Sequence, residues 1–142
     1  MDIRVFVVDD HPLMRDSLRA LLEQQPDMEV VGEAADGPAA VRRVRQCRPD
    51  VVVMDVGLPG LSGIEVTHRV VADVPDIKVL GLSVHSDRRY VLSMLKAGAS
   101  GYVLKDDAFD DLVVAVRAVV ENETYLSPGL AGKRWLDRVP LC

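Results

Sequence analysis

Polar side chains that could do chemistry follow the apolar runs of this sequence. Asp9 and Asp10 come directly after IRVFVV, and Asp55 ends VVVMD. Ser83 and Lys105 end two further runs, IKVLGLS and GYVLK. A single Asp after a strand is usually a turn residue or a helix cap, and a single Lys is usually solvated surface. Four apolar runs that each end in a polar group are a less common coincidence, and they indicate a site.

Three carboxylates in one crevice repel one another. Two unit charges about 5 Å apart at an effective dielectric of about 20 cost about 3 kcal/mol. A hard divalent cation compensates for this cost, and Mg²⁺ prefers carboxylates, water and phosphate oxygens. With the ion and Lys105 neutralising charge on the transferring oxygens, one carboxylate can act as a nucleophile toward a phosphoryl group. Asp55 is the candidate nucleophile because it stands alone, whereas Asp9 and Asp10 form the adjacent pair expected of metal ligands.

Five strand-like runs alternate with segments of helical spacing. The runs span residues 3–8, 28–34, 51–54, 77–83 and 101–105. Strict alternation predicts crossover connections and a parallel sheet buried on both faces, which explains why the runs are rich in Val and Ile throughout. The predicted fold class is therefore α/β with a doubly wound sheet. In such sheets ligands bind outside the carboxyl ends of the strands.

The last predicted helix covers about residues 108–121. Helical spacing assigns the side facing the sheet to Phe109, Leu112, Val113, Val116 and Val120. The other side holds Val114, Ala115 and Ala118. It is either a partner surface or a solvent-facing side with tolerated small apolar residues.

The composition limits the class of protein. A chain of 142 residues fits one compact domain. The net charge of -5 argues against non-specific nucleic-acid binding, which depends on Lys and Arg. Two cysteines are too few for a disulfide framework, and no apolar stretch approaches the length of a membrane span. The start MDIRVFVVDD lacks the features of a signal peptide, so a cytoplasmic location without membrane contact is expected.

Four stretches carry a resemblance to a known family, namely VFVVDDHPLMRDSLRALL, VVVMDVGLPGLSGIE, VLGLSVHSD and LKAGASGYVLKDD. They resemble the receiver domain of two-component response regulators, specifically the NarL/FixJ (LuxR-type) subfamily. The resemblance implies a CheY-like, flavodoxin-like fold with a five-stranded parallel sheet in the order 2-1-3-4-5. It divides the chain into a receiver domain, residues 1–124, and a tail, residues 125–142. The tail is either a linker or a non-native end, and the DNA-binding domain of the family is absent.

The resemblance implies a role for each site residue. Asp55 would accept phosphate from a phosphohistidine of a sensor histidine kinase. Ser83 would hydrogen-bond the acyl phosphate, and Lys105 would pair with its oxygen. Tyr102 would change rotamer when the Ser83 loop moves. Phosphorylation would then favour a homodimer, and the intact protein would control transcription by binding DNA through its missing C-terminal domain.

The resemblance also implies a metal site and positions that tune the lifetime of the phosphate. The Mg²⁺ ligands would be Asp9, Asp10, Asp55 and the carbonyl of Gly57. Gly57 and His85, each two residues beyond a site residue, would affect dephosphorylation. Ser83 stands where Thr is common in the family, which keeps the hydroxyl. Asp106 replaces the frequent Pro after Lys105, which leaves open whether that peptide bond is cis.

Two alternatives remain beside the phosphorylated receiver, which is not an enzyme although it assists its own phosphorylation and dephosphorylation. The first is a non-phosphorylated docking module, against which the complete site argues. The second is an aspartate-nucleophile phosphatase, which would need a second acid two residues after the nucleophile to protonate the leaving group. Gly57 occupies that place. The loop GLPGLSG is a weak match to a dinucleotide-binding loop, because its glycine spacing differs and Pro59 has no N–H to donate.

Overall fold

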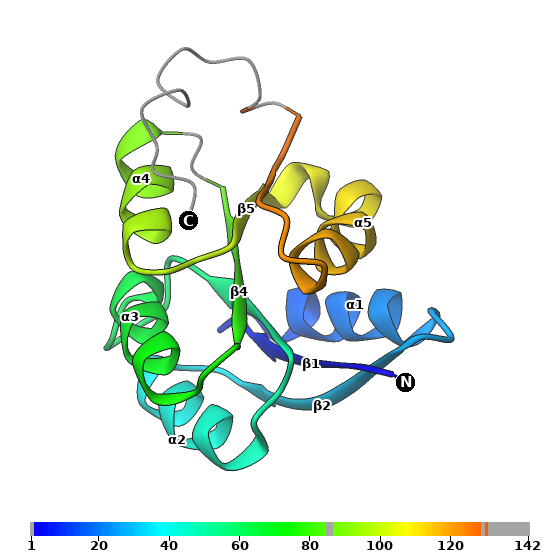
Figure 1. Cartoon of the computed structure of the whole chain (residues 1–142), viewed down its shortest axis with the longest axis horizontal. Coiled ribbons are helices and arrows are strands. Elements are labelled where there is room, and N and C mark those ends of the chain that lie inside the picture. The colour runs from blue at the N-terminus through cyan, green and yellow to red at the C-terminus, as the bar shows by residue number, and fades with distance from the viewer. Residues whose placement is uncertain (1, 85–86, 129, 131–142) are drawn as a thin grey trace.

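The computed structural model describes residues 2–84, 87–128 and 130, in which strands and helices alternate as predicted (Figure 1). The strands are β1 (Ile3–Val8), β2 (Met28–Ala34), β3 (Val51–Asp55), β4 (Lys78–Ser83), β5 (Gly101–Leu104) and β6 (Tyr125–Leu126). The helices are α1 (Pro12–Glu23), α2 (Gly37–Cys47), α3 (Gly63–Asp73), α4 (Arg88–Lys96) and α5 (Ala108–Val120). No helix in this described part of the chain has the length and apolarity needed to cross a membrane.

The sheet is parallel throughout and has the strand order β2-β1-β3-β4-β5-β6. The expected order is confirmed, but the expected number of strands is wrong because β6 pairs with β5. Gly101 permits this pairing, since a side chain there would overlap the carbonyl of Tyr125. Ser127 secures it further, because its Oγ accepts a hydrogen bond from the Leu104 N–H at 2.8 Å. A two-residue strand is too short to produce a recognisable sequence pattern.

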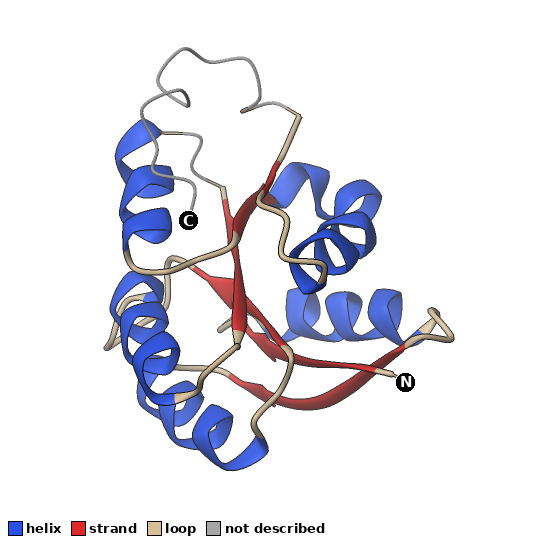
Figure 2. Ribbon diagram, in the orientation of Figure 1, coloured by secondary structure: helices blue, strands red, loops and turns tan. Residues whose placement is uncertain are grey.

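Helices cover both faces of the sheet (Figure 2). Side chains alternate between the two faces along each strand, so that Val5 and Val7 pack against α1 and α5. Phe6 and Val8 point to the opposite face and pack against the helices α2, α3 and α4. The middle of each central strand, residues 5–8, 51–54 and 79–82, therefore lacks polar side chains, as a sheet buried on both faces requires.

The prediction for the last helix is partly wrong. Leu112 and Val116 face the sheet as expected, but Ala115, which was assigned to the other side, is buried with them, as is Val119. Phe109, in contrast, is 55% exposed. The buried side of α5 is made by Ala108, Leu112, Ala115, Val116 and Val119, and Phe109 lies outside this set. A short 3-10 helix, Lys105–Asp107, precedes α5. The Lys105–Asp106 bond is trans, because the described residues contain no cis peptide bond.

Gly63, the first residue of α3, provides a test of this packing. A Cβ there would overlap the carbonyl of Asp55 and lie 2.8 Å from the Cα of Val56. We expect Gly63→Ala to lower the free energy of unfolding by about 1–3 kcal/mol, because the overlap forces backbone shifts. Urea unfolding measures this change. Gly57→Ala is the control, since its Cβ would meet only Asp55 Oδ1 at 3.7 Å; equal stability of the two variants would contradict the packing argument.

Candidate functional site at the carboxyl edge of the sheet

Strand register places the predicted site residues at one edge of the sheet. Val8 pairs with Met54, so the next residues of the two strands, Asp9 and Asp55, are level with each other. Farther along the sheet Ser83 pairs with Leu104, the residue before Lys105. The structure thus brings together side chains that are up to about a hundred positions apart in the sequence.

Lys105 connects the two buried carboxylates. Its Nζ lies 3.4 Å from Asp9 Oδ2 and 3.5 Å from Asp55 Oδ2. The Asp9 side chain has no exposed surface and that of Asp55 is 4% exposed, whereas Lys105 is 15% exposed. Burial reduces the screening of these charges, so the ammonium group compensates for much of the repulsion between the carboxylates.

The environment of Asp55 raises its pKa above the usual value. Burial is the largest cause, because it penalises the charged form. The Asp9 charge and a hydrogen bond with Asp10 act in the same direction. The backbone N–H of Gly57, which donates to Asp55 Oδ1 at 3.0 Å, and the charge of Lys105 oppose them. The environment of Asp55 therefore favours the neutral, protonated form of its side chain more than water does.

The neighbouring acidic residues have unused acceptor capacity. Among the described residues, none donates a hydrogen bond to Asp9 Oδ2 or Asp10 Oδ1, although both atoms are buried. Ligand atoms from Asp9, Asp10, His11 and Asp55 all lie within 4.8 Å of one another. Buried carboxylate oxygens without donors are the ligands that a hard divalent cation prefers, so the residues fit Mg²⁺.

Ser83 and Tyr102 lie farther along the same edge. Ser83 is 2% exposed and Tyr102 has no exposed surface. Burial raises the pKa of Tyr102, and a side-chain hydrogen bond with Ser83 opposes this shift. The two predicted switch residues are therefore in contact. Gly57 is exposed at the mouth of the site, and His85 lies outside the described residues.

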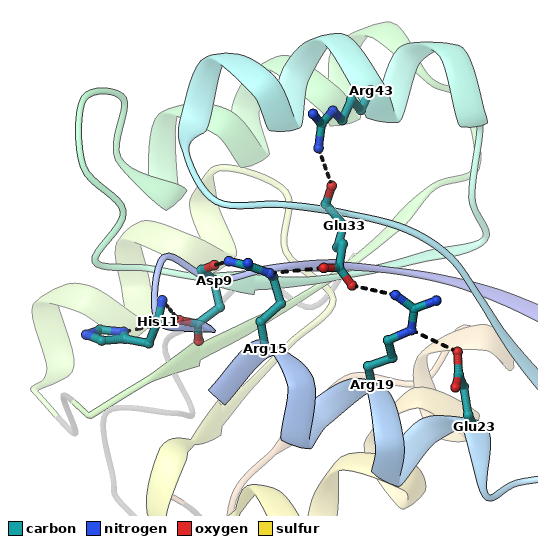
Figure 3. A network of polar contacts seen from close by, with 7 residues as sticks. All are labelled: Asp9, His11, Arg15, Arg19, Glu23, Glu33 and Arg43. Carbon is teal, nitrogen blue, oxygen red and sulfur yellow. Dashed lines mark hydrogen bonds and ion pairs between the residues drawn. The ribbon is translucent and has the colours of Figure 1, made fainter. Parts of the chain in front are cut away.

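A network of hydrogen bonds and ion pairs that the sequence did not reveal contacts the backbone carbonyl of Asp9 (Figure 3). Arg15 donates from its guanidinium to the carbonyl of Asp9 at 2.8 Å and to Glu33 at 3.2 Å. Arg19 donates to the other oxygen of Glu33 at 3.0 Å, and Arg43 donates to the Glu33 carbonyl at 2.7 Å. These contacts join α1, β2 and α2 to the end of β1. Arg15 and Glu33 are 18 positions apart, and no local spacing rule pairs them.

Comparison with known proteins defines the class. The family model of the response regulator receiver domain matches residues 5–117. The chain is 41% identical over 126 residues to the transcriptional regulatory protein DegU of Brevibacillus brevis, which covers 89% of this chain and 53% of DegU. It is 40% identical over 127 residues to the oxygen regulatory protein NreC of Staphylococcus carnosus, with 89% and 58% covered. This chain therefore belongs to the response regulator receiver family, and both named relatives are regulatory proteins.

Solved structures indicate the subfamily of response regulators to which the chain belongs. A LuxR-family response regulator from Aurantimonas sp. SI85-9A1 superposes with a TM-score of 0.91 at 38% identity, over 99% of this chain and all of that one. The receiver domain of the putative regulator NarL from Mycobacterium tuberculosis gives 0.82 at 35% identity, over 86% and 98%. These likenesses and the relatives above place the chain in the NarL/FixJ subfamily, as the sequence predicted.

The raised pKa of Asp55 predicts a dependence of stability on pH. A carboxyl group with a raised folded-state pKa favours folding below its unfolded pKa, and this contribution is lost as the pH rises through the folded pKa. At neutral pH the buried charge is therefore unfavourable. Without divalent cations, we expect Asp55→Asn to raise the free energy of unfolding by about 1 kcal/mol at neutral pH, and by less in acid.

Denaturant unfolding at both pH values measures the effect. The exposed Asp106 provides the control, since Asp106→Asn should change stability by less than about 0.5 kcal/mol. Destabilisation by Asp55→Asn at neutral pH would show that its ion pair with Lys105 outweighs the cost of burial.

Proposed function

We propose that Asp55 is the phospho-acceptor of this receiver domain and takes its phosphoryl group from a phosphohistidine of a sensor histidine kinase. The observation that carries the proposal is the position of Lys105 Nζ, 3.4 and 3.5 Å from the buried Asp9 and Asp55 carboxylates. A buried ammonium beside a carboxylate at the mouth of the sheet can neutralise the oxygens of an incoming phosphoryl group.

The chemistry follows from this geometry. A carboxylate oxygen of Asp55 forms a bond to phosphorus, the P–N bond of the phosphohistidine breaks, and the histidine nitrogen keeps the electron pair. Lys105 pairs with a phosphoryl oxygen, and the N–H of Gly57 holds the other Asp55 oxygen at 3.0 Å. When bound, Mg²⁺ neutralises charge on the phosphoryl oxygens. Its proposed ligands are Asp9, Asp10, Asp55 and the carbonyl of Gly57.

We infer that the switch runs through Ser83 and Tyr102. An aspartyl phosphate adds negative charge and strong acceptor oxygens beside a buried core. The hydroxyl of Ser83 can donate to these oxygens, and its existing hydrogen bond with Tyr102 couples such a movement to β5. A shift from 1:99 to 99:1 between two states requires about 5.5 kcal/mol of differential stabilisation. We propose that new contacts of the phosphoryl group with Ser83, Lys105 and the metal supply this free energy.

The proposed output of the switch, control of transcription, requires the intact protein. The chain spans about half to three fifths of the length of the curated relatives named above, and DegU is named a transcriptional regulatory protein. We propose that phosphorylation favours a homodimer of the receiver and that a C-terminal domain outside this chain binds DNA. The net charge of -5 supports a separate domain for that task.

Phosphorylation by a small donor tests the acceptor. We expect acetyl phosphate and Mg²⁺ to add one phosphoryl group, detected as a single mass increment of the intact protein. Asp55→Asn and omission of Mg²⁺ should each abolish the increment. Asp106→Asn serves as the matched control and should be modified like the wild type. A folded protein that gains no phosphate under any of these conditions would overturn the proposal and favour a docking module.

Gly57 provides a test of phosphate lifetime. Because it is exposed and its N–H touches Asp55 Oδ1, a long side chain there would obstruct the approach of water to the phosphate. We expect Gly57→Arg to lengthen the half-life of the phosphorylated protein several-fold, measured by the decay of the mass increment. Pro59→Arg adds the same charge two positions away and should leave the half-life unchanged. An unchanged half-life in Gly57→Arg would contradict the role of Gly57.

A further inference from the structure

His11 adds a nitrogen to the acidic cluster, and the proposed role of the cluster in Mg²⁺ binding does not use it. Its Nδ1 lies 3.1 Å from Asp9 Oδ1 and 3.2 Å from Asp10 Oδ1. The backbone N–H of His11 also donates to Asp9 Oδ1 at 2.9 Å, which fixes the residue beside that carboxylate. Figure 3 shows the ring beside Asp9, away from the Arg15–Glu33 contacts.

These separations match the edge of a metal coordination sphere. Two adjacent ligand atoms of an octahedral ion lie about 3.0 Å apart when each is about 2.1 Å from the ion, and opposite ligand atoms lie about 4.2 Å apart. The Nδ1–oxygen distances of 3.1 and 3.2 Å are close to the first value. The limit of 4.8 Å for the whole set is close to the second. Small side-chain movements suffice to bring the four groups around one ion.

The ring makes one contact that a bound ion would replace, the hydrogen bond between its Nδ1 and Asp9 Oδ1 at 3.1 Å. His11 is the residue before α1, but its side chain makes no capping hydrogen bond. The side chain is 67% exposed, so Nε2 can keep its proton and bind water while Nδ1 faces the carboxylates. Which nitrogen carries the proton depends on the tautomer, and a change of tautomer frees the Nδ1 lone pair without a change in charge.

We propose that His11 Nδ1 is an additional ligand of this site and makes it prefer octahedral transition-metal ions of the Fe²⁺, Co²⁺ and Ni²⁺ class over Mg²⁺. Imidazole suits such ions, whereas Mg²⁺ selects oxygen ligands and retains its waters. A neutral ligand also strengthens binding without adding to the repulsion among three carboxylates. The buried oxygens Asp9 Oδ2 and Asp10 Oδ1, to which no described residue donates a hydrogen bond, supply the anionic part of the site.

The inference rests on the proposed metal site, so its test must separate the two. Isothermal titration calorimetry of the whole chain, with Co²⁺ alone and with Mg²⁺ alone, measures the affinity for each ion. We expect His11→Phe to weaken Co²⁺ binding about tenfold or more and to leave Mg²⁺ binding nearly unchanged. The variant keeps a ring of similar size at an exposed position, and circular dichroism verifies its fold.

A spectroscopic measurement reports the ligand directly. Proton NMR of the Co²⁺-loaded protein should show a strongly shifted, exchangeable ring N–H signal, because a bound imidazole lies next to a paramagnetic ion. The signal should be absent in His11→Phe and present in His68→Phe, since His68 is an exposed histidine on α3 outside the cluster.

The outcomes distinguish the two proposals. Equal Co²⁺ affinity in the wild type and His11→Phe, without the shifted signal, would overturn the role of His11 and leave the Mg²⁺ site intact. Failure of the wild type to bind either ion would overturn both. A loss of Mg²⁺ affinity as large as that of Co²⁺ would also contradict the proposed selectivity.

Discussion

The contact of Lys105 with the carboxylates of Asp9 and Asp55 is the interaction on which this site depends. Three carboxylates at the end of a buried sheet would otherwise repel one another in a poorly screened environment. Lys105 sits between two of them at 3.4 and 3.5 Å, and the N–H of Gly57 holds Asp55 at 3.0 Å. Even so, the pKa of Asp55 is raised, chiefly because burial penalises its charged form. A bound cation would add positive charge beside these carboxylates.

The rest of the fold holds this contact in place. β1 and β3 pair so that Asp9 and Asp55 end level, and β5 delivers Lys105 from the far side of β4. Helices pack on both faces of the sheet, and the two hydrophobic clusters that result fix the strands in place. The contacts of Arg15 and Glu33 then connect the end of β1 to the outer strand β2. A movement of Asp9 is therefore opposed by contacts on three elements.

Much of the fold and of the candidate site could be predicted because the signals are local. Continuous Val-rich runs reported strands buried on both faces, and polar residues at their carboxyl ends indicated the position of the site. β6 escaped prediction because its pairing depends on the missing side chain of Gly101. Phe109 was misassigned because helical periodicity gives the angle between residues but not which side of the helix packs on the sheet, and the buried side proved to centre on Ala108, Leu112, Ala115 and Val119.

The sequence by itself determined the α/β class, the strand order through its family resemblance, and the identity of the polar residues at the strand ends. These follow from composition, alternation and motif, which are properties of neighbouring residues. Only the tertiary structure decided that Lys105 contacts two carboxylates at once, that Arg15 pairs with Glu33, and that the His11 ring adjoins Asp9 and Asp10. The reason is geometric: strand register and side-chain direction over distances of about 3 Å set these contacts, and sequence spacing does not specify them.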